Sequence, residues 1–393
     1  MLGAPAACPL AVTRLTLTDF RNYRALRLET APAPVVLTGA NGAGKTNLLE
    51  ALSFLAPGRG LRRARLAEVA RRPAAGEAAP AAAWAVAATV TTPDGPVDIG
   101  TGRDPGSEAG DRRLVRIDGA PAKGQAQLAR LLSVAWLTPE MDRLFLEAAS
   151  GRRRFLDRMT YGFAPDHAGH LSAYERAMRE RGRLLRDGVL DDAWLGALEH
   201  AMAENGVAVA AARRDTVERL GRALALGTGA FPRPTVAIEG AVEGWLDEGP
   251  ALAAEDRLRA RLAEMRRHDA ETSGAAEGPH RSDLVVRHAD KDMPAAQCST
   301  GEQKALLVAL VLAAARLQGA ERGAPPLLLL DEIAAHLDES RRSALFDEIC
   351  ALGAQAWMTG TDRRLFDALE GRAQFFTVAD GTIAPGRDSW TLQ

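Results

Sequence analysis

A glycine-rich segment near the start of the chain has the spacing of a phosphate-binding loop. Gly39, Gly44, Lys45 and Thr46 fit the pattern G-x4-G-K-[ST], and Gly39 follows the apolar residues 35–37 after one intervening residue. Backbone N–H groups of such a loop turn onto phosphate oxygens, and the following helix points its positive end at the same anion. The expected nucleotide contacts are Gly39, Ala40, Asn41, Gly42, Ala43, Gly44, Lys45, Thr46 and Asn47.

Two side chains of this loop carry specific chemistry. We expect Lys45 to reach the β- and γ-phosphates and to act in catalysis, and the Thr46 hydroxyl to ligate Mg²⁺. The alternative interpretation is a glycine-rich turn that happens to carry a lysine.

A second group of chemical residues follows an uninterrupted apolar run late in the chain. Leu327–Leu330 is followed at once by Asp331 and Glu332, which indicates a central parallel strand with carboxylates at its carboxyl end. In P-loop enzymes this position holds an Asp for Mg²⁺, and a neighbouring Glu can polarise the attacking water. We assign the first role to Asp331 and the second, catalytic role to Glu332. The alternative is a buried strand that ends in solvated acids.

A third segment opens a long apolar helix. Ser299 and Glu302 have the spacing of a capping box, before a helix that is expected to run to Leu317. A serine-capped helix start that contains glycine is also a site for anions. The two roles are compatible.

The surrounding pattern predicts the elements that position these residues. Alternation over 12–29 predicts two strands with a turn at Arg21-Asn22, and residues 47–55 continue the helix after the loop. Residues 139 to about 267 have helical spacing, interrupted near Pro232 and Pro234. The Ala/Pro/Gly-rich segment 73–81 is expected to be a mobile loop. Further short strands are expected at 35–37, 84–90, 97–100, 114–117, 235–238 and 284–287, with hairpin turns at 94–95 and 118–119.

Composition limits the class of protein. The chain has 393 residues, a length that suggests one large domain with a substantial insertion or two domains. Its hydrophobic content of 47% and charged content of 25% are ordinary for a soluble globular protein. The first residues lack the basic start of a secretory signal. The longest apolar run, 305–315, is too short to cross a bilayer and is expected to be a buried helix. Cys8, Cys298 and Cys350 fit no zinc or redox spacing and suggest reduced thiols in the cytoplasm.

A formal net charge of −2 means that any nucleic-acid surface must be a local patch. The best block of cations follows the P-loop helix, and the alternative for every block is a solvated, ion-paired helix face. No base-reading motif is present, so contacts would be to the backbone and sensitive to salt. The first block is Arg59, Arg62, Arg63 and Arg65, with Arg71 and Arg72; the others are Arg152, Arg153, Arg154 and Arg158, and Arg179, Arg181, Arg183 and Arg186.

The order of these motifs resembles an ABC-type ATPase. The resemblance implies an α/β fold, with a mixed sheet and flanking helices at 1–138 and 279–393 and a mostly helical lobe inserted at 139–278. It also implies that two nucleotide domains face each other head to tail around ATP and Mg²⁺. The segment of one copy that would approach the γ-phosphate of the other is Ser299, Gly301, Glu302 and Gln303, and Asp338 belongs to the dimer loop.

Within that class the chain resembles the RecF family, related to SMC proteins, over about residues 12–370. The matching stretches are 20–23, 39–47, 153–157, 278–284 and 299–304, of which Gly-Pro-His-Arg-x-Asp-Leu at 278–284 separates the family from transporters and SMC proteins. The resemblance implies a cytoplasmic, weak DNA-stimulated ATPase in DNA repair and replication. It would bind gapped or duplex DNA as an ATP-dependent homodimer and help RecO and RecR to load RecA. No membrane association is expected.

The chain departs from the ABC pattern at two places. The segment 357–362 has no switch histidine, so Thr359 or Thr361 is left to contact the γ-phosphate. Gln125 and Gln127 are the glutamines available to complete Mg²⁺ coordination, and neither has a persuasive context. Slow hydrolysis would follow from these gaps.

Three other functions compete with this interpretation. A transporter ATPase subunit would need a far shorter separation than the 254 positions from Lys45 to Ser299, and it would have the switch histidine. An SMC- or RecN-like structural protein would need hundreds of heptad residues in the insertion. A scaffold with a dead nucleotide site would not keep Lys45, Thr46, Asp331 and Glu332 intact.

Overall fold

The computed structural model describes residues 8–72, 83–103, 113–189, 191–227, 229–272 and 274–386. The expected mobile loop at 73–81 lies outside the described residues. The chain divides into two compact units, here called the sheet unit and the helical unit. The sheet unit holds the described residues within Met1–Asp142, Thr228–Phe231 and Leu307–Gln393, and the helical unit holds those within Arg143–Gly227 and Pro232–Leu306.

The sheet unit contains an antiparallel sheet built from hairpins. Its strand order is β2-β1-β4-β5-β6-β7. The hairpin turn predicted at 118–119 is confirmed, whereas the turn predicted at 94–95 lies one residue earlier, at 93–94, because Gly95 already pairs with Thr92 as the first residue of β5. Alternating apolar residues of β1 face the core, which is why Leu15 and Leu17 are buried. The strands are β1 (Ala11–Phe20), β2 (Tyr23–Glu29), β4 (Ala85–Thr92), β5 (Gly95–Arg103), β6 (Arg113–Ile117) and β7 (Ala120–Pro121).

The second sheet of this unit is mostly parallel and carries the chemical segments. Its order is β15-β14-β3-β13-β12-β8. β13 pairs in parallel with both β3 and β12, and all four leucines of β12 are buried, as the apolar run predicts. The strands are β3 (Val35–Thr38), β8 (Val134–Leu137), β12 (Leu327–Leu330), β13 (Ala356–Gly360), β14 (Gln374–Ala379) and β15 (Thr382–Pro385).

Helices pack on these sheets around one apolar core. The core joins β1, β3 and β12 to α1 (Lys45–Ser53), whose Leu48, Leu49 and Leu52 are buried. The unit also contains α2 (Leu66–Val69), η1 (Gln125–Gln127), α3 (Leu128–Leu131), η5 (Ile333–His336), α11 (Glu339–Leu352), η6 (Arg363–Leu369) and most of α10 (Thr300–Arg322), and η2 (Pro139–Arg143) spans the end of the unit.

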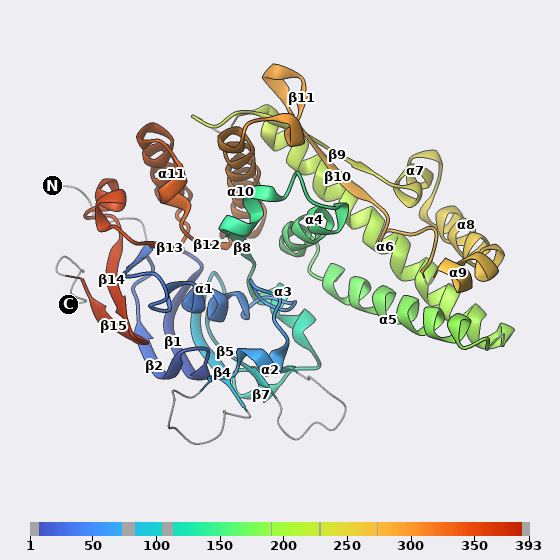
Figure 1. Cartoon of the computed structure of the whole chain (residues 1–393), viewed down its shortest axis with the longest axis horizontal. Helices are drawn as coiled ribbons and strands as arrows, with labels where there is room; N and C mark the ends of the chain where they lie inside the picture. The colour runs from blue at the N-terminus through green and yellow to red at the C-terminus, as the bar shows by residue number, and fades with distance from the viewer. Residues whose placement is uncertain are drawn as a thin grey trace. The chain divides into compact units, whose positions relative to one another are not determined.

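The helical unit is built on a long antiparallel helix pair, drawn in green in Figure 1. α5 (His167–Arg186) and α6 (Asp192–Ala225) pack through Tyr174, Met202 and Val207. The unit also contains α4 (Ala149–Phe163), α7 (Ala241–Glu248), α8 (Ala251–Glu264), α9 (Arg266–Thr272), the short η3 (Ala289–Lys291) and η4 (Ala295–Gln297), and a sheet of order β11-β10-β9 formed by β9 (Pro234–Glu239), β10 (Asp283–His288) and β11 (Met293–Pro294).

The division between the units differs from the predicted lobe boundary. The sequence assigns residues 279–306 to the ATPase lobe, whereas these residues group with the helical unit. The reason is that β10 pairs along its whole length with β9, so that Leu284 lies opposite Ile238. The division falls within α10 (Thr300–Arg322).

One helix of the described residues, α10, is long and apolar enough to cross a membrane by length and composition alone. Its apolar stretch is 78% buried inside the protein. Residues 305–315 are all buried, as predicted for a core helix. The three cysteines are free, with Cys8 and Cys298 buried.

Candidate nucleotide-binding site

The phosphate-binding loop has the predicted strand–loop–helix form. β3 ends at Thr38 and α1 begins at Lys45. Gly39 and Gly44 have φ of 150° and 114°, which side chains rarely adopt. A Cβ on Gly39 would also collide with the carbonyl oxygen of Val378, and one on Gly44 would collide with Asn22 and Tyr23. Both glycines are therefore required by the local geometry.

Lys45 lies folded over this loop. The residue is largely buried, and its Nζ donates to the carbonyl oxygens of Gly39 at 2.7 Å and Ala40 at 2.9 Å. Burial lowers the pKa of Lys45 from its ordinary value, and the negative charges of Glu332 and Asp331 oppose that shift. The ammonium thus belongs to the same electrostatic site as the two acids.

The two predicted magnesium ligands lie together. The Thr46 hydroxyl lies 3.0 Å from each carboxylate oxygen of Asp331, although 285 residues separate them. Strand register brings the two side chains together. β12 and β3 both pair in parallel with β13, so Asp331 at the end of β12 and the loop at the end of β3 lie at the same edge of the sheet.

This donor set fits Mg²⁺. Among the described residues, no group of three or more His, Cys, Asp or Glu side chains could hold a metal ion. Mg²⁺ does not need such a group, since it is usually held by one or two protein ligands together with substrate phosphates and water. A hydroxyl and one carboxylate beside a phosphate loop are therefore suitable, with Thr46 and Asp331 as the residues that would hold the ion.

Residues of the 20–23 stretch brace the loop, a role that the sequence did not reveal. Asn22 donates to the carbonyl of Ala43 at 3.2 Å and accepts from Asn47 at 2.7 Å. Tyr23 donates to the carbonyl of Gly44 at 3.1 Å. The one available signal was that this stretch belongs to the family resemblance.

The candidates for the missing switch and glutamine positions lie in other contacts. Thr359 is fully buried and bonded to Asp331 at 2.7 Å, while Thr361 is exposed. The Gln125 side-chain oxygen accepts from Gly58 N and Arg113, which ties it to the loop after α1, and Gln127 is exposed. Neither glutamine has a hydrogen bond to the acids in the described residues.

The signature segment forms the predicted capping box within the helical unit. Ser299 N donates to Glu302 at 3.0 Å, and Glu302 N donates to the Ser299 hydroxyl at 3.4 Å. Lys291 pairs with Glu302, and together with the Ser299 N–H it lowers the pKa of Glu302 to about 2. Ser299 and Gly301 are exposed, whereas Gln303 is buried and donates to the carbonyl of Cys298 at 2.8 Å.

Asp338, the predicted dimer-loop residue, is exposed in the sheet unit. Its carboxylate caps α11 by accepting from Arg341 N at 2.8 Å. The cap fixes where the helix begins and leaves the side chain 58% exposed.

The arginine blocks differ in how many of their charges are already paired. Arg152 is bound to Asp283 at 2.7 Å, and Arg181 is buried between Glu199 and Asp269. In the first block, Arg62 binds Glu50 at 3.1 Å and Asn47 at 2.5 Å. Within that block Arg59, Arg63 and Arg65 are exposed. The first block therefore offers the most accessible positive charge.

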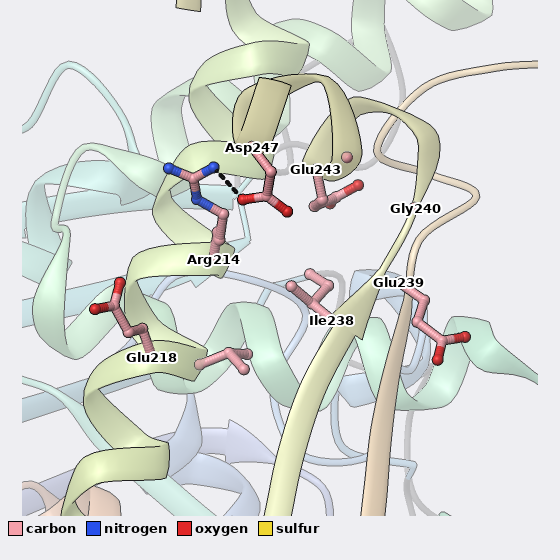
Figure 2. Close-up of a pocket in the computed structure, with 9 residues that line it drawn as sticks. Arg214, Glu218, Ile238, Glu239, Gly240, Glu243 and Asp247 are labelled. Atoms are coloured by element: carbon pink, nitrogen blue, oxygen red, sulfur yellow. Dashed lines mark hydrogen bonds and ion pairs between the residues drawn. The ribbon is translucent and has the colours of Figure 1, made fainter. Parts of the chain in front are cut away.

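A pocket of about 510 Å³ lies within the helical unit, between α6, β9 and α7 (Figure 2). Its rim includes the ion pair of Arg214 with Asp247 at 2.8 Å. It contains none of the residues that the sequence predicts to carry chemistry.

A phosphate loop and an acidic strand end at one edge of a mixed sheet are the arrangement of a P-loop ATPase, and the Ser-x-Gly-Glu-Gln segment at 299–303 is typical of the ABC type. Solved structures agree with that fold. A structure described as the recombination mediator protein RecF-ATP in the RecFOR pathway matches with a TM-score of 0.80 at 21% identity, covering 96% of this chain and 100% of that one. An Smc head domain from Pyrococcus furiosus matches with a TM-score of 0.54 at 17% identity, covering 95% of each chain.

Sequence relatives narrow the class. The family model described as RecF/RecN/SMC N terminal domain matches residues 11–384. Proteins named DNA replication and repair protein RecF are 52% identical in Mesorhizobium japonicum, over 96% of this chain and 98% of the relative, and 51% identical in Rhizobium etli, over 95% and 98%. The chain belongs to the RecF family.

Proposed function

We propose that this protein is an ATP-dependent, DNA-binding recombination mediator that acts in DNA repair and replication in the cytoplasm. The observation that carries the proposal is the meeting of Lys45, Thr46 and Asp331 at the mouth of the phosphate loop. The relatives named DNA replication and repair protein RecF support the biological role.

Each site residue has a chemical task in this proposal. When bound, Mg·ATP supplies a phosphoanhydride bond whose cleavage is coupled to attack by water. Lys45 holds the phosphates, and Thr46 and Asp331 hold the metal ion. Glu332 orients the water and accepts its proton, since a carboxylate beside the metal ligand is placed for general-base work. The absence of a switch histidine at 357–362 supports slow hydrolysis.

The assembly proposed is a head-to-tail homodimer. Ser299, Gly301, Glu302 and Gln303 of each copy would approach the nucleotide held by the other copy, with Asp338 beside the junction. The exposed Ser299 hydroxyl at a capped helix start supports this role, because such a terminus favours an anion. Closure would clamp gapped or duplex DNA, and RecO and RecR would then assist loading of RecA.

DNA would contact the block Arg59, Arg62, Arg63 and Arg65 through its phosphates. Weak DNA-stimulated ATPase activity is compatible with this placement, because Arg62 bonds to Asn47 next to the phosphate loop. The family alternatives are less well supported. The longest helix in the described ranges, α6, has 34 residues, far from the hundreds of heptad residues of an SMC arm.

The direct test is dimerisation. Lys45→Met removes the phosphate contact, so we expect ATP to drive the wild type from monomer to dimer in sedimentation velocity and to leave the variant monomeric. Lys123→Met, an exposed lysine outside the loop, is the matched control and should dimerise. If Lys45→Met dimerised with ATP as the wild type does, the proposed nucleotide-gated assembly would be wrong.

A further inference from the structure

The hydroxyl of Thr359 makes two hydrogen bonds at the centre of the acidic strand end. It donates to Asp331 Oδ1 at 2.7 Å and accepts the backbone N–H of Glu332 at 2.9 Å. The side chain is completely buried. One threonine therefore holds both of the acids that the proposed chemistry requires.

The register of β13 explains this position. Met358 lies opposite Leu330 of β12, and Thr359 lies opposite Leu37 of β3. Thr359 is thus one residue beyond the last pair with β12, level with the point where that strand turns into Asp331. β13 lies between the strand that leads to the phosphate loop and the strand that leads to the acidic turn, which places the Thr359 hydroxyl beside that turn.

The backbone at the turn is strained. Glu332 has φ 51° and ψ 24°, in the left-handed region, where Cβ lies too close to the following carbonyl oxygen. Such strain persists where surrounding contacts over-determine it. The bond from Glu332 N to Thr359 is one of these contacts, since it gives the buried end of the turn a fixed partner.

Hydroxyl chemistry suits the task. A threonine supplies one donor and two acceptor lone pairs, and here the donor meets a carboxylate while a lone pair meets an N–H. The Asp331 carboxylate also receives the Thr46 hydroxyl at 3.0 Å. With two hydroxyls on one carboxylate, its rotation is restricted and the direction of its remaining lone pairs is set.

We propose that Thr359 is a positioning residue that orients Asp331 toward the metal ion and fixes the turn that carries Glu332. This rests on the proposed ATPase function. The sequence predicts Thr359 or Thr361 as a γ-phosphate contact. In the structure the Thr359 hydroxyl already donates to Asp331 and accepts from Glu332 N. Its effect is transmitted through the two acids.

The test removes the hydroxyl while keeping the shape. Thr359→Val should raise the Mg²⁺ concentration needed for half-maximal ATP binding by about 10–100-fold, the usual effect of losing a partner that orients a metal ligand. ATP binding in EDTA should stay at the wild-type level. Mn²⁺ in place of Mg²⁺, followed by electron paramagnetic resonance, reports metal binding without turnover. Turnover at saturating ATP should fall by a similar factor.

Three further variants separate positioning from general stability. Thr359→Ser keeps the hydroxyl and should recover metal binding and turnover. Thr359→Ala gives the same comparison if the valine variant does not fold. Thr216→Val is the matched control, because Thr216 is equally buried and, within the described part of the chain, its hydroxyl bonds only to the carbonyl of Ala212 in its own helix.

The outcomes are distinct. Wild-type Mg²⁺ dependence in Thr359→Val or Thr359→Ala, or a Thr359→Ser variant as defective as these, would overturn the positioning role while leaving the proposed function intact. A wild-type protein with no Mg²⁺-dependent ATP binding would refute the proposed function itself and this inference with it.

Discussion

The two adjacent acids at the end of β12 have different surroundings. Asp331 is buried and bonded to Thr46 and Thr359. The Glu332 carboxylate has no hydrogen bond among the described residues, and its backbone turns into the left-handed region. A carboxylate held by donors is suited to a metal ion, and one without donors is suited to accept a proton. The surroundings of Asp331 and Glu332 therefore distinguish a metal ligand from a general base, a distinction that the two adjacent acids in the sequence do not make by themselves.

This difference predicts the effect of Glu332→Gln. The amide keeps the shape of the side chain and cannot accept a proton, so ATP turnover should fall by at least ~100-fold, the usual range for loss of a general base. Mg²⁺ and ATP should still bind, and the dimer should persist with ATP in sedimentation. Single-turnover hydrolysis is the measurement.

The control for this change is Glu339→Gln, an exposed glutamate in the first turn of α11. It should hydrolyse ATP normally. Wild-type turnover in Glu332→Gln would assign the base to another group.

The residues of the candidate site were predictable where one segment encodes its own geometry. The phosphate loop and the acids of β12 are local patterns, and both lie where the sequence predicts them. The bonds from Thr359 to Asp331 and from Asn22 to Ala43 were not predictable. They depend on strand register and on the return of β1 and β2 to the loop, which no local pattern contains.

The strands likewise fall into those that the sequence predicts and those that it does not. The hairpin of β1 and β2 and the strand β12 were predicted, since alternation and unbroken apolar runs are strong signals. β8, β14 and β15 were not identified. β8 has four residues, too few for a period to be recognised, and it is a strand because it pairs with β12. Tertiary pairing decided its structure.

The segment 278–284 has a structural role that its sequence did not indicate. His280 joins two partners in the helical unit, with Nδ1 2.6 Å from the Tyr174 hydroxyl and Nε2 2.9 Å from the Ala275 carbonyl. Arg213 donates to the carbonyl of Pro279 at 2.5 Å, and Ser282 donates to Glu243 at 2.6 Å. The family string therefore ties α5, α6 and α7 together.

This network makes stability depend on pH. The two partners fit a neutral imidazole that accepts at Nδ1 and donates at Nε2. Burial, with nearby Arg281 and Arg153, lowers the pKa of His280 to about 4, from an ordinary value near 6.5. As the pH falls, the imidazole is protonated in the unfolded chain at a higher pH than in the folded protein. The contribution of the neutral imidazole to the free energy of unfolding is therefore fully present above pH 6.5 and is lost as the pH falls toward 4. The loss is up to about 3 kcal/mol.

Urea unfolding at pH 7 and pH 4.5 measures this loss, and NMR of the imidazole gives the titration directly. His280→Gln should show a smaller difference between the two pH values. Tyr174→Phe removes the donor to Nδ1 and should raise the pKa of His280. An imidazole that titrates at its ordinary value in the folded protein would contradict the prediction.

Asp157 does not contribute within that window. Although burial acts to raise its pKa, Arg213 and His167 hold it at about 2. The contribution of this ion pair to the free energy of unfolding is therefore fully present above the ordinary carboxyl pKa and is lost as the pH falls from about 4 toward 2. Acid unfolding should show two phases of lost stability, with the His280 contribution preceding that of Asp157.

At the scale of the whole molecule, charge is balanced overall and uneven locally. The net charge is −2, and many exposed arginines of the helical unit are paired with acids on their own helices, such as Arg183 with Glu180 and Arg222 with Glu218. Exposed pairs of this kind contribute little stability and cancel each other's field. Nucleic acid would therefore be attracted by patches that lack such pairing.

The block after α1 predicts how DNA binding responds to salt. Each arginine that neutralises a phosphate contributes about one unit to the slope of log affinity against log salt. Replacement of Arg59, Arg63 and Arg65 by Ala should reduce that slope by about 2–3 and weaken binding equally for all sequences. Arg62 is left in place because it holds Glu50 and Asn47 beside the phosphate loop.

The matched control is a second triple variant, Arg179→Ala, Arg183→Ala and Arg222→Ala, which removes the same charge from ion-paired positions. Fluorescence anisotropy with gapped and duplex DNA at several salt concentrations, with ATP present, compares the two. We expect the control to retain the wild-type slope, because its arginines already have carboxylate partners. Equal losses in both variants would mean that total charge attracts DNA. Loss in the control alone would place the DNA surface on the helical unit.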